Sequence, residues 1–67
     1  MNRLAKAIYL INLKGYRVDR KHPSIFIYGY GRDGSSKEPI ASFMDPSETR
    51  QAIFLEGFLA CLNAHSK

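Results

Sequence analysis

Apolar and polar positions alternate most regularly in the middle of the chain, where aromatic side chains occupy every second position at Phe26, Tyr28 and Tyr30. Such alternation is typical of a half-buried strand. The Asp33-Gly34 pair separates this run from a second alternating run, and it favours a type I′ turn because both central residues of that turn need positive φ. The pattern therefore predicts a β-hairpin that turns at Asp33-Gly34.

Helical spacing of apolar residues brackets the hairpin. Residues 2–14 carry one apolar stripe, and Gly15 is placed to end that helix. The stripe consists of Leu4, Ala7, Ile8 and Ile11. Tyr9, Leu10 and Leu13 lie off it, so this helix is either covered on two sides or partly extended in its second half.

A second helical pattern follows the hairpin and extends to about Asn63. We predict Asp45 as its N-cap, Pro46 at its first helical position and Glu48 as the partner in a capping box. Its apolar stripe must face the hairpin or the first helix. That stripe consists of Phe54, Leu55, Phe58, Leu59 and Leu62.

These elements predict one small α+β domain that spans residues 1–67. Residues 16–18 have the pattern of a short strand and residues 19–23 that of a polar loop, so the order is α-β-β-β-α or α-β-β-α in two layers. A chain of 67 residues buries only about 60% of its unfolded surface, which leaves a marginal core. Self-association as a dimer would relieve that shortage.

A two-residue turn at Asp33-Gly34 would also fix which side chains share a face of the sheet. One face would carry Ile25, Ile27, Ile40 and Ser42, and the other Phe26, Tyr28, Tyr30, Ala41 and Phe43. A two-layer domain covers only one face with its own helices, so the other face needs a partner unless its aromatic residues join the core. A four-residue loop would shift this pairing while keeping the alternation.

Charge is distributed unevenly along the chain. The net charge is +4, made up of +6 over residues 1–37 and −2 over residues 38–67. A basic half favours an anionic partner, nucleic acid first, although it also serves simply to keep a small protein in solution. We expect a small binding module, of a kind typical of phage-like or mobile-element accessory proteins, that binds a protein partner through the aromatic hairpin face. The alternative is a DNA- or RNA-binding regulator.

Both functions use overlapping residues. Aromatic side chains can stack on bases or anchor a protein interface, and Lys and Arg can contact phosphates. The candidate binding residues are Arg17, Arg20, Lys21, Phe26, Tyr28, Tyr30, Arg32 and Lys37. The candidate dimerisation residues are Ile53, Gly57 and Ala60, because a glycine inside a helix costs about 1 kcal/mol and favours a place where another backbone comes close. That backbone belongs either to the first helix or to a second subunit.

Nothing in the sequence favours catalysis. The acids are scattered, and His22 and His65 are too far apart in sequence to suggest a metal site, so we expect no enzyme activity, no metal and no cofactor. The single cysteine, Cys61, fits a small buried residue in a reducing, cytoplasmic compartment. The longest apolar runs are far shorter than the roughly 18 residues that span a bilayer, so we expect no membrane contact.

The layout of these elements resembles that of some small nucleic-acid-binding modules. A hairpin followed by a helix that begins Asp-Pro-Ser-Glu resembles AP2-type and integrase arm-binding domains, and the αβββα order resembles double-stranded RNA-binding domains. The basic cluster that starts the last helix of a double-stranded RNA-binding domain is replaced here by Asp45 and Glu48. That departure disfavours binding to double-stranded RNA.

Overall fold

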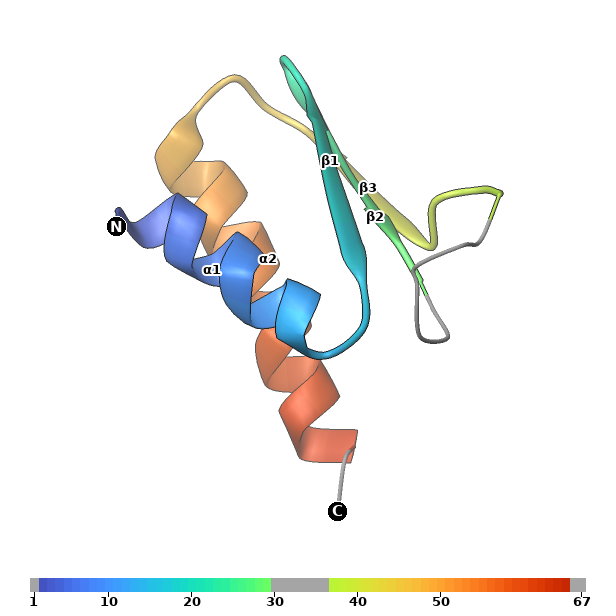
Figure 1. The fold of residues 1–67 in the computed structure, drawn as a ribbon. Coiled ribbons are helices and arrows are strands. Elements are labelled where there is room, and N and C mark those ends of the chain that lie inside the picture. Colours follow the sequence, from blue (N-terminus) through green and yellow to red (C-terminus); the bar gives the residue numbers. More distant parts are fainter. Residues whose placement is uncertain (1, 30–36, 66–67) are drawn as a thin grey trace.

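The computed structural model describes residues 2–29 and 37–65 of the chain. Its elements are α1 (Arg3–Leu13), β1 (Arg17–Lys21), β2 (Ser24–Tyr28), β3 (Ala41–Met44) and α2 (Glu48–His65). The three strands form one antiparallel sheet in the order β1-β2-β3. Both helices lie together on one side of this sheet (Figure 1). The predicted two-layer α+β fold is therefore confirmed.

Helix α1 has a well-defined start and end. The Asn2 side chain accepts a hydrogen bond from the Ala5 amide (2.7 Å), which caps the first turn. Gly15 has a φ of 94°, and the Gly15 and Tyr16 amides donate to the carbonyls of Asn12 and Ile11. These two bonds form a Schellman motif, which confirms Gly15 as the residue that ends the helix.

The tight hairpin of the sheet joins β1 to β2. Strand β1 extends through Lys21, so the prediction of a loop over residues 19–23 was wrong for residues 19–21. Only His22 and Pro23, joined by a cis peptide bond, form the turn. The charged run was misleading because β1 is an edge strand, where charged side chains reach solvent without breaking the ladder.

The pairing of β2 with β3 differs by one residue from the predicted register. Ile25 lies opposite Phe43 instead of Ser42, and Ile27 lies opposite Ala41. Residues 29–40 separate the two strands, and the predicted Asp33-Gly34 turn lies outside the described residues. Because side chains alternate along a strand, this shift moves Phe43 and Ala41 to the aliphatic face and Ser42 to the aromatic face.

The core lies between the aliphatic face of the sheet and the two helices. Its buried members come from α1, β2 and α2: Leu4, Ala7, Ile11, Ile25, Ile27, Ala52 and Leu55. Phe43 packs against this core and stacks on Phe54, with ring centroids 5.0 Å apart and planes 11° apart. The predicted apolar stripes of both helices thus face the core, whereas Tyr9 and Leu13 on α1 are exposed.

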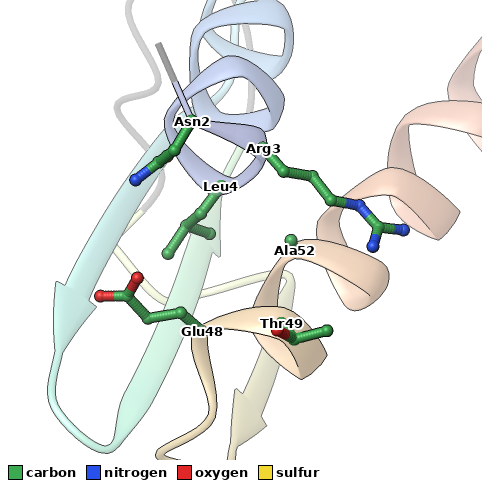
Figure 2. Close-up of a pocket in the computed structure, with 6 residues that line it drawn as sticks. All are labelled: Asn2, Arg3, Leu4, Glu48, Thr49 and Ala52. Carbon is green, nitrogen blue, oxygen red and sulfur yellow. The ribbon is translucent and has the colours of Figure 1, made fainter.

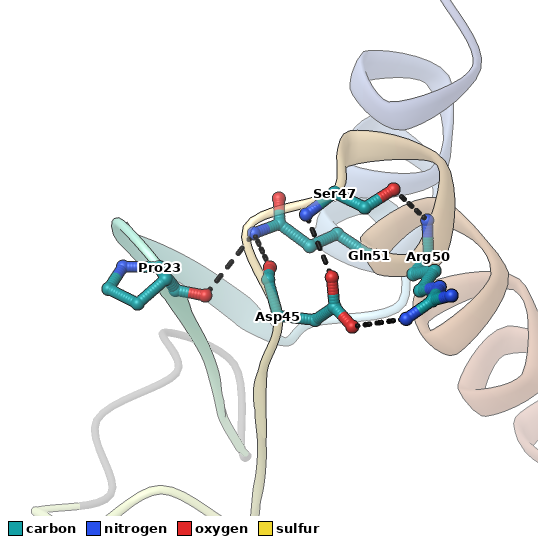
Figure 3. Close-up of polar contacts among 5 residues, drawn as sticks. All are labelled: Pro23, Asp45, Ser47, Arg50 and Gln51. Atoms are coloured by element: carbon teal, nitrogen blue, oxygen red, sulfur yellow. Dashed lines mark hydrogen bonds and ion pairs between the residues drawn. The ribbon is translucent and has the colours of Figure 1, made fainter.

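The start of α2 lies two residues later than predicted. Ser47 is the N-cap, since its Oγ accepts from the Arg50 amide (3.3 Å) and its carbonyl accepts from the Gln51 amide (3.0 Å). Asp45 precedes the helix and accepts from the Ser47 amide (2.8 Å) and from Arg50 Nη1 (3.1 Å), as Figure 3 shows. The predicted capping box was therefore wrong, because Glu48 occupies the first helical position, too close to the cap to reach back.

Gln51 ties the start of α2 to the β1–β2 turn. Its side chain is buried, and Nε2 donates to the Asp45 carbonyl (2.8 Å) and, at 3.5 Å, to the Pro23 carbonyl (Figure 3). The Asp45 amide in turn donates to the same Pro23 carbonyl (3.0 Å). The turn, the end of β3 and α2 are therefore joined by one polar cluster at one end of the molecule.

Candidate binding surface

The observed register defines the side of the sheet that the helices leave uncovered. We call this side the outer face. Its residues are Arg17, Asp19 and Lys21 on β1, Ser24, Phe26 and Tyr28 on β2, and Ser42 and Met44 on β3. Phe26 and Tyr28 are half-buried and do not belong to the hydrophobic core, and Met44 is 74% exposed. Figure 1 shows both helices on the opposite side.

Arg17 and Tyr28 form the most defined contact on the outer face. They lie directly opposite each other on β1 and β2, and the Arg17 guanidinium carbon is 4.1 Å from the centroid of the Tyr28 ring. A cation–π contact of this kind contributes about 0.5–1 kcal/mol at an exposed site. The contact holds the long Arg17 side chain against the sheet, which reduces the entropy it would lose on binding a partner.

The remaining charges of the outer face largely compensate each other. Lys21 Nζ lies 3.8 Å from Asp19 Oδ2, both on β1. The outer positions of β2 and β3 carry no charge at all. The surface therefore has an uncharged centre with two aromatic rings and a methionine, bordered on one side by charged residues of β1.

The structure does not bring all predicted binding residues together. Arg20 lies opposite Ile25, on the helix side of the sheet, where its Nη2 is 3.6 Å from Glu48 Oε2 of α2. Lys37 is exposed beyond the sheet. Tyr30 and Arg32 lie outside the described residues. Arg17, Lys21, Phe26 and Tyr28 are thus the predicted residues that share one face.

The predicted dimerisation residues lie on the solvent side of α2. Ile53, Gly57 and Ala60 are exposed, and a Cβ added at Gly57 would meet no atom within 4 Å. The interpretation that Gly57 admits the backbone of α1 is therefore wrong. Cys61 is also exposed rather than buried, because it lies on the flank of α2 that faces away from the core.

A depression lies at the N-terminal ends of the two helices, and its charged side chains are ion-paired, Arg3 with Glu56 and Glu48 with Arg20. Figure 2 shows its lining residues, with Leu4 and Ala52 between the polar side chains of the two helices. Arg3 points toward α2, where Nε and Nη2 donate to the two carboxylate oxygens of Glu56, each at 2.6 Å. These hydrogen bonds hold the pKa of Glu56 below its usual value and raise that of Arg3.

Within residues 2–29 and 37–65, no group of three or more potential metal ligands comes together. The same residues contain no helix long and apolar enough to cross a bilayer. The outer face of the sheet is therefore the candidate functional site.

Sequence reasoning missed one further feature, the outer edge of β3. Met44 at the end of this strand is 74% exposed, and Ile53 on α2, which lines an apolar depression together with Phe43, is 53% exposed. The available signal was the absence of charge from residues 40–44, but the register error assigned Phe43 to the wrong face.

Comparison with protein-family models, curated proteins and solved structures finds no match to this chain. Its function must therefore be argued from the geometry of the outer face.

Proposed function

We propose that this protein is a small non-enzymatic binding module that acts by docking a protein partner on the outer face of its sheet. The observation that carries the proposal is the distribution of side chains on that face. Phe26, Tyr28 and Met44 form an uncharged patch, and charged residues occupy one border. Protein interfaces have this arrangement, with aromatic and methionine side chains enriched at the centre and charged residues at the rim.

Binding of a nucleic acid is the alternative proposal. It is supported by the Arg17–Tyr28 stack and by the net charge of +4. It is weakened by the pairing of Lys21 with Asp19 and by the position of Arg20 behind the sheet, next to Glu48. The described outer face carries two cations, Arg17 and Lys21, and one anion, Asp19. Its electrostatic attraction for a phosphate backbone is therefore weak.

A photo-crosslinking phenylalanine analogue at position 26 tests both proposals in one experiment. The full chain carrying this probe is expressed in cells and irradiated, and its adducts are identified by mass spectrometry. The probe at position 9 is the control, since Tyr9 is also exposed but lies on α1. We expect protein adducts from position 26 that are absent from position 9.

The same chain with Tyr28→Ala should give about tenfold less adduct, because interface aromatic residues commonly contribute more than 1 kcal/mol to binding. Its thermal unfolding should change little, since Tyr28 lies outside the core. Nucleic-acid adducts from position 26 would establish the alternative. Equal adducts from positions 26 and 9, or none from position 26, would contradict both proposals.

A further inference from the structure

Arg17 differs from the other arginines of residues 2–29 and 37–65 in its charge environment. Each of the others forms an ion pair with a carboxylate. These pairs are Arg3–Glu56, Arg20–Glu48 and Arg50–Asp45. Arg17 is exposed on the outer face, and no carboxylate of the described residues lies within ion-pairing distance of it. Its charge is therefore available to an anion from another molecule.

The contact with Tyr28 positions the Arg17 side chain without using its hydrogen-bond donors. The guanidinium carbon lies over the Tyr28 ring, 4.1 Å from the centroid. Attraction to the face of a ring leaves the N–H groups of the guanidinium free, and these groups form a planar fork that matches a carboxylate. Arg17 is thus held in place before a partner arrives.

The neighbouring charges of the outer face favour an anion with a single charge. Asp19 compensates Lys21, at 3.8 Å, so Arg17 is the uncompensated cation of the described outer face. A carboxylate matches this one charge. A phosphate group carries about −1.5 to −2 and is typically recognised by a cluster of arginines. Arg20 cannot complete such a cluster, because it lies on the helix side of the sheet.

An apolar row begins directly beside Arg17. Tyr28 lies opposite Arg17, and Phe26 is the next residue of β2 on the same face. Met44 lies opposite Ser24 at the other end of β2. The distance along the strand from Tyr28 to Ser24 is about 13 Å, at about 3.3 Å per residue. A segment bound along β2 therefore meets a cation at one end and apolar side chains over the remaining length.

We propose that the partner docked on the outer face presents a carboxylate side chain to Arg17 and an apolar side chain to Phe26. This inference rests on the proposed function, since it specifies the chemistry of the segment that the outer face binds. The occupant is a protein segment in which an aspartate or glutamate lies within about 13 Å of an apolar residue. The carboxylate fixes the orientation of the segment, and the apolar contact contributes buried area.

Selection from a library of random-sequence peptides tests this chemistry with a defined probe. The full chain is immobilised, and the peptides that it retains are sequenced. We expect an acidic residue at a preferred spacing from an apolar residue. Selection on the Arg17→Met chain should lose the acidic preference and keep the apolar one. Lys6→Met is the matched control, because it removes the same charge from an exposed position of α1, and it should keep both preferences.

A selected peptide then allows a quantitative test by calorimetric titration. Replacing its acidic residue by the corresponding amide should weaken binding at least about tenfold, and so should Arg17→Met, since each change removes a charge-assisted pair. Both changes together should weaken binding no more than either alone, because they remove the same pair. Arg17→Lys should recover part of the affinity, since lysine keeps the charge but lacks the planar fork.

Selected peptides without an acidic preference, or losses that add independently, would overturn this inference and leave the proposed function standing. An acidic preference that survives Arg17→Met would also overturn it, because it would reflect general attraction to a chain of net charge +4. Displacement of the peptides by a random oligonucleotide would assign Arg17 to a phosphate instead. Absence of any selected peptide, or peptides whose affinity is unchanged by Phe26→Ala, would contradict the proposed function as well.

Discussion

At the scale of single residues, Gly29 has no room for a side chain. A Cβ at this residue would lie 2.6 Å from Tyr16 Cε2, 2.7 Å from Tyr16 Cδ2 and 2.9 Å from Ile40 Cδ1. The Tyr16 ring is held from another side by Phe58, in an edge-to-face contact with centroids 5.5 Å apart. Gly29 therefore allows the Tyr16 ring to approach the backbone at the end of β2. This contact packs the connection between α1 and β1 against the sheet.

Gly29→Ala should lower the free energy of unfolding by about 1–3 kcal/mol, since the ring must shift away from its packed position. Denaturant unfolding of the two proteins measures this difference. Gly57→Ala is the matched control: its Cβ meets nothing, and alanine is the better helix former by about 1 kcal/mol, so stability should rise. Equal stability of the Gly29→Ala variant and the natural chain would show that Tyr16 is not fixed.

At the scale of elements, the junction before α2 determines how the helix meets the sheet. Ser47 caps the helix, Asp45 holds the turn before it, and Gln51 links both to the β1–β2 turn. Because these contacts connect three elements, the junction fixes the direction in which α2 leaves β3. It thereby places Phe54 over Phe43.

Ser47→Ala should destabilise the protein by about 1 kcal/mol, because the Arg50 amide loses its capping partner. Thr49→Ala, in the same first turn, provides the comparison and should cost nothing, since alanine has the higher helix propensity. Thermal unfolding of both variants measures the effect. If Ser47→Ala matches Thr49→Ala, Ser47 does not cap the helix.

At the scale of the whole molecule, two carboxylates make stability depend on pH. The Ser47 amide first, and then Arg50, hold the pKa of Asp45 below its usual 3.8. The Arg3 guanidinium holds the pKa of Glu56 below its usual 4.5 and joins α1 to α2. Since the folded pKa values are lower than the unfolded ones, both groups stabilise the fold fully above the unfolded values, and this contribution is lost as pH falls through the folded values.

We therefore expect the melting temperature to fall as the pH is lowered below about 4.5. The double variant Asp45→Asn and Glu56→Gln should melt lower than the natural chain near neutral pH, and its melting temperature should vary less across the acid range. Melting curves of the two proteins over the same pH series measure this difference. Parallel curves would show that these two carboxylates do not carry the acid sensitivity.

The sequence by itself determined the elements whose signals are local. The apolar stripe of α1 with Gly15 after it, the stripe of α2 and the alternation of β2 each reflect contacts between residues close in the chain, and the α+β fold follows from their order. The same local alternation placed Phe26 and Tyr28 correctly on one face. The protein or nucleic-acid partner of that face stays a prediction.

The tertiary structure alone decided how these elements meet. The charged strand β1 exists because it pairs with β2, and the one-residue shift between β2 and β3 is selected by the burial of Phe43 against Phe54. Neither contact leaves a local signal, because each joins residues that are distant in sequence and depends on which side chains the core can accept. For the same reason only the structure places Arg17 and Arg20 on opposite faces of the sheet.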